Sequence, residues 1–218
     1  MSFSTIDFKR PLTSYAKVRI IIGNLIRGKS SFIKNNRIKD KVLLNVGCGP
    51  YPLKEFANLD YAWTPEIDVC WDFIKKKFPF PDNSFEGIFT EHCLEHISYE
   101  QCFETLKEFH RMLKPGGTIR IIVPDGQIYI DLYHERTKDP SISLPYGQEE
   151  ETGIISINRI FRNHGHLFIY DAETMGLQLS KVGFRNVKKE SFAAGRDKRL
   201  LIDRPERAVE SLYIEATK

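Results

Sequence analysis

The chain has 218 residues, of which 41% are apolar and 28% charged, and its formal net charge is +3. This length and composition predict one large folded domain, or one domain with an extension, with enough apolar residues for a sizeable core. The longest apolar stretch, near residues 18–26, is interrupted by Arg19, Gly23 and Asn24. It is too short and too polar to cross a bilayer, so no transmembrane segment is expected.

The N-terminus and the cysteines predict a cytoplasmic protein. The first residues lack the compact apolar core and the cleavage site of a signal peptide. Four cysteines, at positions 48, 70, 93 and 102, form no C-x-x-C pair. Neither a disulfide framework nor a cysteine zinc site is therefore expected, and a reducing compartment is favoured.

Residues 1–40 are predicted to form a basic, largely helical N-terminal extension. Residues 1–41 contain ten Lys or Arg against two Asp, a balance of +8, which leaves −5 on the other 177 residues. Tyr15, Val18, Ile22 and Leu25 recur at helical spacing and predict an apolar face that packs on the domain. The basic face could make a weak contact with an anionic surface or acceptor; the alternative is a helix whose charges are only solvated.

From Lys41 onward, short apolar runs alternate with helical patterns. Strands are predicted at 42–46, 57–59, 67–70, 85–90 and 118–123, with a closing antiparallel pair at 184–191 and 211–216. A helix begins after Ser98, which forms a capping-box pattern with Gln101, and the Pro-Gly-Gly run at 115–117 ends it. Another helix is predicted at 172–181, after a long excursion at 125–166. This order predicts a three-layer α/β domain with a mixed sheet.

A glycine turn follows the first predicted strand. The turn is Asn45-Val46-Gly47-Cys48-Gly49-Pro50. Asp60, at the end of the next strand, follows Gly49 by eleven residues. Glycine lets the backbone approach a ligand closely, and a strand-end carboxylate can accept hydrogen bonds from a ribose diol. The dinucleotide fingerprint G-x-G-x-x-G does not fit, because Pro52 stands at its third glycine. A purely structural bend is the other alternative.

Several further segments carry the pattern of one enzyme family. In chain order they are Asn45–Pro50, Asn58–Asp60, Asp72-Phe73, Pro79–Phe85, Glu91–His96, Leu113–Gly117, Val182–Phe184 and Ser211–Ala216. Over about residues 41–218 the chain therefore resembles the class I S-adenosylmethionine-dependent methyltransferases, in particular the short bacterial type. The resemblance implies a three-layer Rossmann-like fold, a seven-stranded mixed sheet with a terminal antiparallel pair, and S-adenosylmethionine as cofactor.

The resemblance also implies which residues bind the cofactor. They are Asn45, Gly47, Cys48, Gly49, Asp60, Asp72, Phe73 and Glu91. The glycine turn would pass under the methionine and ribose, Asp60 would hold the ribose hydroxyls, and Asp72 would recognise the adenine amino group. Asp68, four residues earlier, leaves the adenine assignment open.

Three features depart from the family pattern. Asn45 stands where an acidic residue is usual, and Tyr51 where a third glycine is common. The interval from Gly49 to Asp60 is too short for a full helix, so something else must meet the cofactor carboxylate. The basic N-terminal segment is one candidate.

His92 and Asp125 are the candidate catalytic bases. An imidazole can accept a proton from an attacking hydroxyl near neutral pH. The alternative for His92 is a structural polar residue under the next helix, and His96 is predicted to be structural. His164 and His166, with Glu149–Glu151, are residue types that can bind a metal. Their spacing fits no common ligand set, so no metal is expected.

Together these features predict a methyltransferase that transfers a methyl group to an oxygen atom of a small-molecule or sugar-like acceptor, such as a glycan. No nucleic-acid partner is expected. Residues 125–166 would cover the substrate side. The Asn/Asp-Pro-Pro-Tyr/Phe signature of nucleic-acid amino methylation is absent after the fourth strand, where Thr90-Glu91-His92-Cys93 stands. The alternative function is a non-catalytic cofactor-binding module that partners another protein, which the departures at Asn45 and Tyr51 favour.

Overall fold

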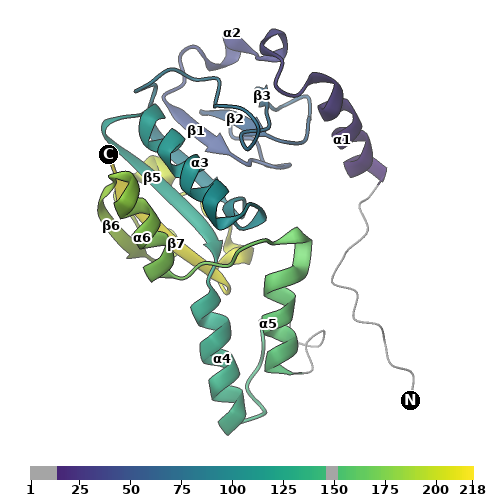
Figure 1. Cartoon of the computed structure of the whole chain (residues 1–218), viewed down its shortest axis with the longest axis vertical. Helices are drawn as coiled ribbons and strands as arrows, with labels where there is room; N and C mark the ends of the chain where they lie inside the picture. Colours follow the sequence, from purple (N-terminus) through teal and green to yellow (C-terminus); the bar gives the residue numbers. More distant parts are fainter. Residues whose placement is uncertain (1–13, 146–151) are drawn as a thin grey trace.

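The computed structural model describes residues 14–145 and 152–218. Within these residues, one sheet of seven strands has the order β3-β2-β1-β4-β5-β7-β6 (Figure 1). Neighbouring strands among β1 to β5 are parallel, and β7 runs antiparallel to both β5 and β6. The strands are β1 (Leu43–Val46), β2 (Phe56–Asp60), β3 (Val69–Cys70), β4 (Phe85–Glu91), β5 (Leu113–Pro124), β6 (Arg185–Glu190) and β7 (Ser211–Thr217). The predicted sheet and its terminal antiparallel pair are confirmed.

One face of the sheet is covered by two helices, α3 (Tyr99–Met112) and α6 (Ala172–Val182). The capping box of Ser98 and Gln101 is present at the start of α3, as predicted. Leu106 and Phe109 of α3 and Met175 and Leu179 of α6 are fully buried against the sheet. Their burial removes apolar surface from water, which contributes about 1.5–3 kcal/mol for each side chain.

The opposite face is covered by the irregular segment that joins β6 to β7. This segment contains the short turns η5 (Lys198–Leu200) and η6 (Pro205–Arg207). Leu200 is fully buried there and packs with Leu43, Phe89 and Tyr213 of the sheet. The central strands therefore have cover on both faces, which explains why nearly every residue of β1, β2 and β4 is buried.

Strand β5 begins five residues earlier than predicted. Helix α3 ends at Met112, and Leu113 already pairs with Phe85 of β4. Gly116 has a φ of 80°. A Cβ on Gly117 would lie 2.9 Å from the Glu86 carbonyl oxygen. The two glycines thus do more than end the helix, because they let the chain continue in close contact with β4.

Two helices of the predicted excursion extend beyond the carboxyl ends of the parallel strands. They are α4 (Gly126–Lys138) and α5 (Gly153–Arg162), and the turn η4 (Asn163–Gly165) follows α5. The two helices pack together closely enough that a Cβ on Gly153 would lie 3.0 Å from the Tyr133 ring. After η4 the chain returns to the end of β5, where Gly126 N–H donates to the Tyr170 carbonyl at 2.8 Å. This return brings η4 and the residues after it to the end of β4.

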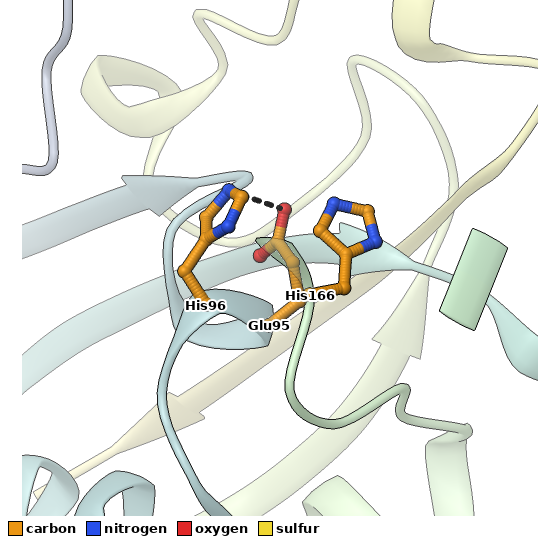
Figure 2. Close-up of side chains that lie close together, drawn as sticks. All are labelled: Glu95, His96 and His166. Carbon is orange, nitrogen blue, oxygen red and sulfur yellow. Dashed lines mark ion pairs between the residues drawn. The ribbon is translucent and has the colours of Figure 1, made fainter. Parts of the chain in front are cut away.

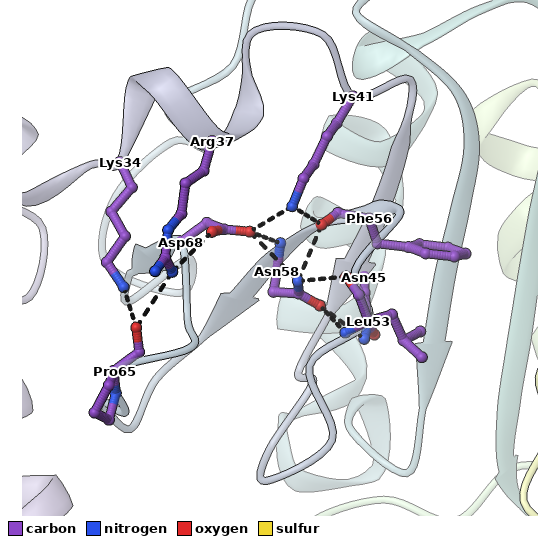
Figure 3. Close-up of polar contacts among 9 residues, drawn as sticks. All are labelled: Lys34, Arg37, Lys41, Asn45, Leu53, Phe56, Asn58, Pro65 and Asp68. Atoms are coloured by element: carbon purple, nitrogen blue, oxygen red, sulfur yellow. Dashed lines mark hydrogen bonds and ion pairs between the residues drawn. The ribbon is translucent and has the colours of Figure 1, made fainter.

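The N-terminal extension contains α1 (Ser14–Ile26), the turn η1 (Ser30–Phe32) and the short helix α2 (Asn35–Ile38). Lys34 donates to the Pro65 carbonyl, and Arg37 and Lys41 lie 3.7 and 3.2 Å from the buried carboxylate of Asp68 (Figure 3). Residues 34–41 are therefore attached to the loop before β3. The part of the extension at residues 1–13 lies outside the described residues.

The predicted apolar face of α1 does not pack on the domain along its length. Of its members, Val18 and Leu25 are exposed, at 52% and 64%, and Ile22 is half-buried. Instead, Arg19 Nε donates to the Trp63 carbonyl at 3.2 Å, and the Arg27 guanidinium lies 3.3 Å from the centre of the ring it covers, that of Tyr61. The loop after β2 presents backbone carbonyls and an aromatic ring to α1. Both groups interact more favourably with a guanidinium group than with an alkyl side chain, so the arginines of α1 face this loop.

Candidate active site

A cavity of about 570 Å³ opens at the carboxyl ends of β1 and β4. This volume lies within the roughly 300–1,000 Å³ typical of small-ligand pockets. One wall is the glycine turn that follows β1, and the opposite wall comes from the end of α5, from η4 and from the segment before β7. Its lining includes Asn45, Gly47, Cys48, Gly49, Tyr51, Glu91, His92, Glu95, His96, Arg159, His164, His166, Arg204 and Arg207.

The two glycines of the turn have different reasons to be glycine. Both have positive φ, 71° at Gly47 and 53° at Gly49. A Cβ on Gly47 would lie 2.4 Å from the Cys93 sulfur, whereas a Cβ on Gly49 would meet no atom within 4 Å. Gly47 is therefore required by packing beneath the turn, and Gly49 presents its backbone to open space, where a ligand can approach.

Asp60 holds the glycine turn from the end of β2. Its two carboxylate oxygens accept hydrogen bonds from Gly49 N–H and Ala62 N–H, each at 2.7 Å. The side chain is almost buried, and this burial raises the pKa of Asp60 despite the two backbone donors and the nearby Arg19 and Arg27. An ionised carboxylate has about four acceptor sites, so it retains capacity for further donors.

Asp72 and Phe73 do not line the cavity. Asp72 Oδ1 accepts from Lys75 N–H at 3.3 Å, and the Phe73 ring stacks on Phe78 with centroids 5.2 Å apart. Asp68 is no nearer, because its buried carboxylate is occupied by Asn58 and by the basic residues of the extension. The adenine assignment stays a prediction for Asp72 and Phe73.

Glu91 and His92 close the end of β4 and line the cavity. Arg204 donates to Glu91 from its backbone N–H at 3.1 Å and also from its guanidinium, which lies 4.5 Å from the centre of the Tyr51 ring. His92 has a φ of 48°, and its Nε2 lies 2.8 Å from the Ser211 hydroxyl. A non-glycine residue at such a φ is uncommon and often occurs at functional sites.

Asp125 lies outside the cavity lining. It caps α4 by accepting from Gln127 N–H at 3.0 Å, and it pairs with Lys189 at 2.9 Å. The structure thus gives this buried carboxylate two partners that the sequence did not reveal. Its role as a base stays a prediction.

Glu95, His96 and His166 come together on one wall of the cavity, beside His92. Glu95 is fully buried, with His92 Nδ1 at 3.4 Å and His96 Nε2 at 3.8 Å from its carboxylate. Burial alone would raise the pKa of Glu95, but His92, His96 and His166 outweigh it, so the net pKa is lowered. Burial lowers the pKa of His166. His96 is therefore part of the cavity wall as well as of the structure beneath it.

Comparison with known proteins finds similarity to methyltransferases. Residues 68–121 match the model of a methyltransferase domain. Over 138 residues the chain is 28% identical to the demethylmenaquinone methyltransferase of Tropheryma whipplei (strain Twist), an alignment that covers 58% of this chain and 52% of that protein. The chain thus spans about half the length of the curated relatives it matches.

Solved structures share the fold over nearly the whole chain. A SAM-dependent methyltransferase from Archaeoglobus fulgidus superposes with a TM-score of 0.54 at 19% identity, covering 92% of this chain and 94% of that one. A possible histamine N-methyltransferase from Thermotoga maritima gives 0.51 at 15% identity, with 93% and 94% covered. These likenesses show that the chain has the fold of the class I S-adenosylmethionine-dependent methyltransferases. None of the helices in the described residues is long and apolar enough to cross a membrane.

The residues at this site fit the cofactor of that family, S-adenosylmethionine. Open space faces Gly49, and the carboxylate that the family uses for ribose lies directly behind it, in Asp60. Cationic side chains that line the cavity come from Arg159 and Arg204, and Arg19 of the extension approaches the Gly49 carbonyl at 3.5 Å. Sequence reasoning missed Arg159 and Arg204 as parts of the site, because no motif marks their segments.

Asn45 stands where an acidic residue is usual in that family, and in this structure its side chain donates a hydrogen bond. Asn45 Nδ2 donates to the Asn58 amide oxygen at 3.3 Å, and that oxygen also accepts from Leu53 N–H at 2.8 Å (Figure 3). Asn58 in turn donates to the Leu53 carbonyl. The three residues tie the end of the turn segment to β2.

An acidic residue at position 45 should therefore destabilise this protein. At position 45, which is 3% exposed, an aspartate would set its carboxylate oxygen against the Asn58 amide oxygen. Both oxygens accept hydrogen bonds, so neither would have a donor. We expect Asn45→Asp to lower the free energy of unfolding by about 1–3 kcal/mol, the cost of an unsatisfied buried polar group. Urea unfolding measures this, with the exposed Asn35→Asp as the matched control; equal stability of the two variants would contradict it.

Proposed function

We propose that this protein transfers a methyl group from S-adenosylmethionine to an oxygen atom of a small-molecule or sugar-like acceptor. The observation that carries this proposal is that the glycine turn and a set of imidazole and carboxylate side chains line the same cavity. When bound, the cofactor supplies a methyl group on a sulfonium, which is a good leaving group. The protein's main task is then to position the acceptor against that methyl group.

The cofactor side of the cavity is assigned to the turn and to Asp60. Gly47 and Gly49 let the backbone approach the methionine and ribose, and Asp60 accepts hydrogen bonds from the ribose hydroxyls. We assign the amino-acid carboxylate of the cofactor to the guanidinium groups of Arg159 and Arg204, which line the cavity. These side chains would replace the helix N-terminus that the short interval before β2 does not supply.

The acceptor side is assigned to His92 and to the walls supplied by α5 and η4. His92 lies between the Ser211 hydroxyl and the Glu95 carboxylate, so its ring is held in one orientation. A base in this position can take the proton that the acceptor hydroxyl loses. Residues 125–166 would cover the substrate, as the sequence predicted.

Release of S-adenosylhomocysteine in the presence of candidate acceptors tests the function. The panel should contain hydroxylated small molecules, sugars and demethylmenaquinone, because two demethylmenaquinone methyltransferases match this chain over half their length. We expect turnover with at least one hydroxylated acceptor. Cofactor binding without transfer to any of them would favour the alternative, a non-catalytic binding module that partners another protein.

Asp60→Asn should weaken cofactor binding. The variant keeps one oxygen, which can accept from only one of the two backbone donors, Gly49 N–H and Ala62 N–H, and it loses the charge that strengthens hydrogen bonds from ribose hydroxyls. We expect the binding of S-adenosylhomocysteine to weaken by about 1–3 kcal/mol, the range for hydrogen bonds to a charged group. Calorimetry measures this, with Asp131→Asn on the exposed side of α4 as control. Unchanged affinity in Asp60→Asn would remove Asp60 from the cofactor site.

A further inference from the structure

Three side chains from two distant segments converge on one point at the edge of the cavity. Glu95 and His96 belong to η2 (Leu94–His96), directly after β4, and His166 follows η4. One ligand atom from each lies within 4.8 Å of the other two. Figure 2 shows the Glu95 carboxylate between the two imidazole rings, whose centroids are 4.9 Å apart.

The buried carboxylate of Glu95 lacks the hydrogen bonds that its burial demands. Its side chain is 0% exposed. Among the groups that the structure describes, neither of its oxygens has a hydrogen-bond partner. Buried charges without such partners are costly, and they are usually paired or bound to metals. His92 Nδ1 and His96 Nε2 lie at ion-pair distances of 3.4 and 3.8 Å from this carboxylate, so they attract its charge without forming the short, aligned hydrogen bonds that a buried carboxylate usually has.

The His166 ring is oriented as a ligand. Its Nδ1 lies 2.6 Å from the Ile160 carbonyl oxygen, which can only accept, so Nδ1 must carry the proton. In the neutral ring, Nε2 then has a free lone pair. A hydrogen bond from one ring nitrogen to a backbone carbonyl is the usual support for a metal-binding histidine.

The backbone holds the two segments in register. The Glu95 carbonyl accepts from Leu167 N–H at 2.7 Å and from Phe168 N–H at 3.2 Å. His166 therefore cannot drift away from Glu95 without breaking two backbone hydrogen bonds. Such rigid support is what a preorganised site needs.

We propose that Glu95, His96 and His166 bind a divalent transition-metal ion at the acceptor wall of the cavity. Two imidazole nitrogens and one carboxylate oxygen are a donor set that suits zinc and its first-row neighbours. Atoms no more than 4.8 Å apart can share a point about 2.8 Å from each. Bonds of about 2.0–2.2 Å then require each side chain to move by less than about 1 Å.

An ion in this place would face the same cavity as His92 and the glycine turn. It would leave coordination positions open on the cavity side, where an acceptor oxygen could bind and be polarised. This role in catalysis rests on the proposed function, whereas the binding of the ion does not. The chemistry would favour acceptors with adjacent oxygen atoms that chelate.

Metal binding can be measured without any methyl acceptor. Zn²⁺ titrated into the full chain in a calorimeter, and Co²⁺ followed by its visible absorption, should each show one bound ion per chain. His96→Ala and His166→Ala should weaken both by at least about tenfold, because even the loss of a group supporting a ligand costs about 10–100-fold. Glu95→Gln should do the same. His96 is partly exposed, so that variant serves even if Glu95→Gln does not fold.

His134→Ala is the matched control, because His134 is an exposed histidine on α4, outside the cluster. It should bind both ions as tightly as the unmodified protein. The proposal is overturned if no ion binds at one per chain, or if His96→Ala and His166→Ala bind as tightly as the control; Glu95 is then only the counter-ion of protonated imidazoles. Methyl transfer plays no part in these measurements, so neither result decides the proposed function.

Discussion

His92→Ala is expected to lower kcat for methyl transfer by about 10²–10⁴-fold, the usual contribution of a positioned general base. The imidazole is held by Ser211 on one side and Glu95 on the other, on a strained backbone with a φ of 48°. Affinity for S-adenosylhomocysteine should barely change, because Asp60 and the glycine turn remain. Single-turnover kinetics with saturating cofactor, together with calorimetry, separate the two effects.

A second variant distinguishes chemistry from structure at this position. His92→Asn can adopt the positive φ more easily than alanine and keeps a side chain that hydrogen-bonds, but it is no base. If His92 removes the proton, His92→Asn loses as much activity as His92→Ala while its thermal unfolding stays near that of the unmodified protein. Recovery of most activity in His92→Asn would make His92 a structural residue, and a parallel loss of cofactor affinity would place it in the cofactor site.

The strands and the glycine turn could be predicted because their signals are local. Runs of apolar residues at 42–46 and 118–123 identify buried strands, and Ser98 with Gln101 marks a helix start. The glycine turn and Asp60 stand at strand ends, and strand ends meet at one edge of the sheet. Local chemistry and topology therefore agree on the position of the residues that we propose bind the cofactor.

The acceptor half depends on a long-range contact that sequence spacing does not show. His166 lies seventy residues after His96, and the two meet because the segment after η4 binds the Glu95 backbone. The spacing argument paired His166 with Glu149–Glu151 instead, which lie outside the described residues. The orientation of α1 failed for a similar reason, since periodicity identifies an apolar face but not the surface that receives the helix.

The segment that carries Arg204 into the cavity is held in place by one buried arginine. Arg120 of β5 is fully buried, and it donates to Asp203, to Glu215 at 2.9 Å and to the Ala194 carbonyl at 2.9 Å. Asp203 and Glu215 in turn accept from backbone N–H groups of the same segment. The two carboxylates raise the pKa of Arg120 although burial opposes this, so the guanidinium stays charged.

Arg120→Ala should lower the free energy of unfolding by about 3–5 kcal/mol, because it leaves two buried carboxylates without their cation. The loss exceeds that of an ordinary surface change, so Arg185→Ala on the exposed face of β6 is the control and should stay within about 0.5 kcal/mol. Urea unfolding compares the two. Since Arg204 follows Asp203 directly and binds Glu91, cofactor affinity should also fall in any Arg120→Ala protein that remains folded. A stable Arg120→Ala protein with unaltered affinity would show that the segment is held by Leu200 and its apolar neighbours alone.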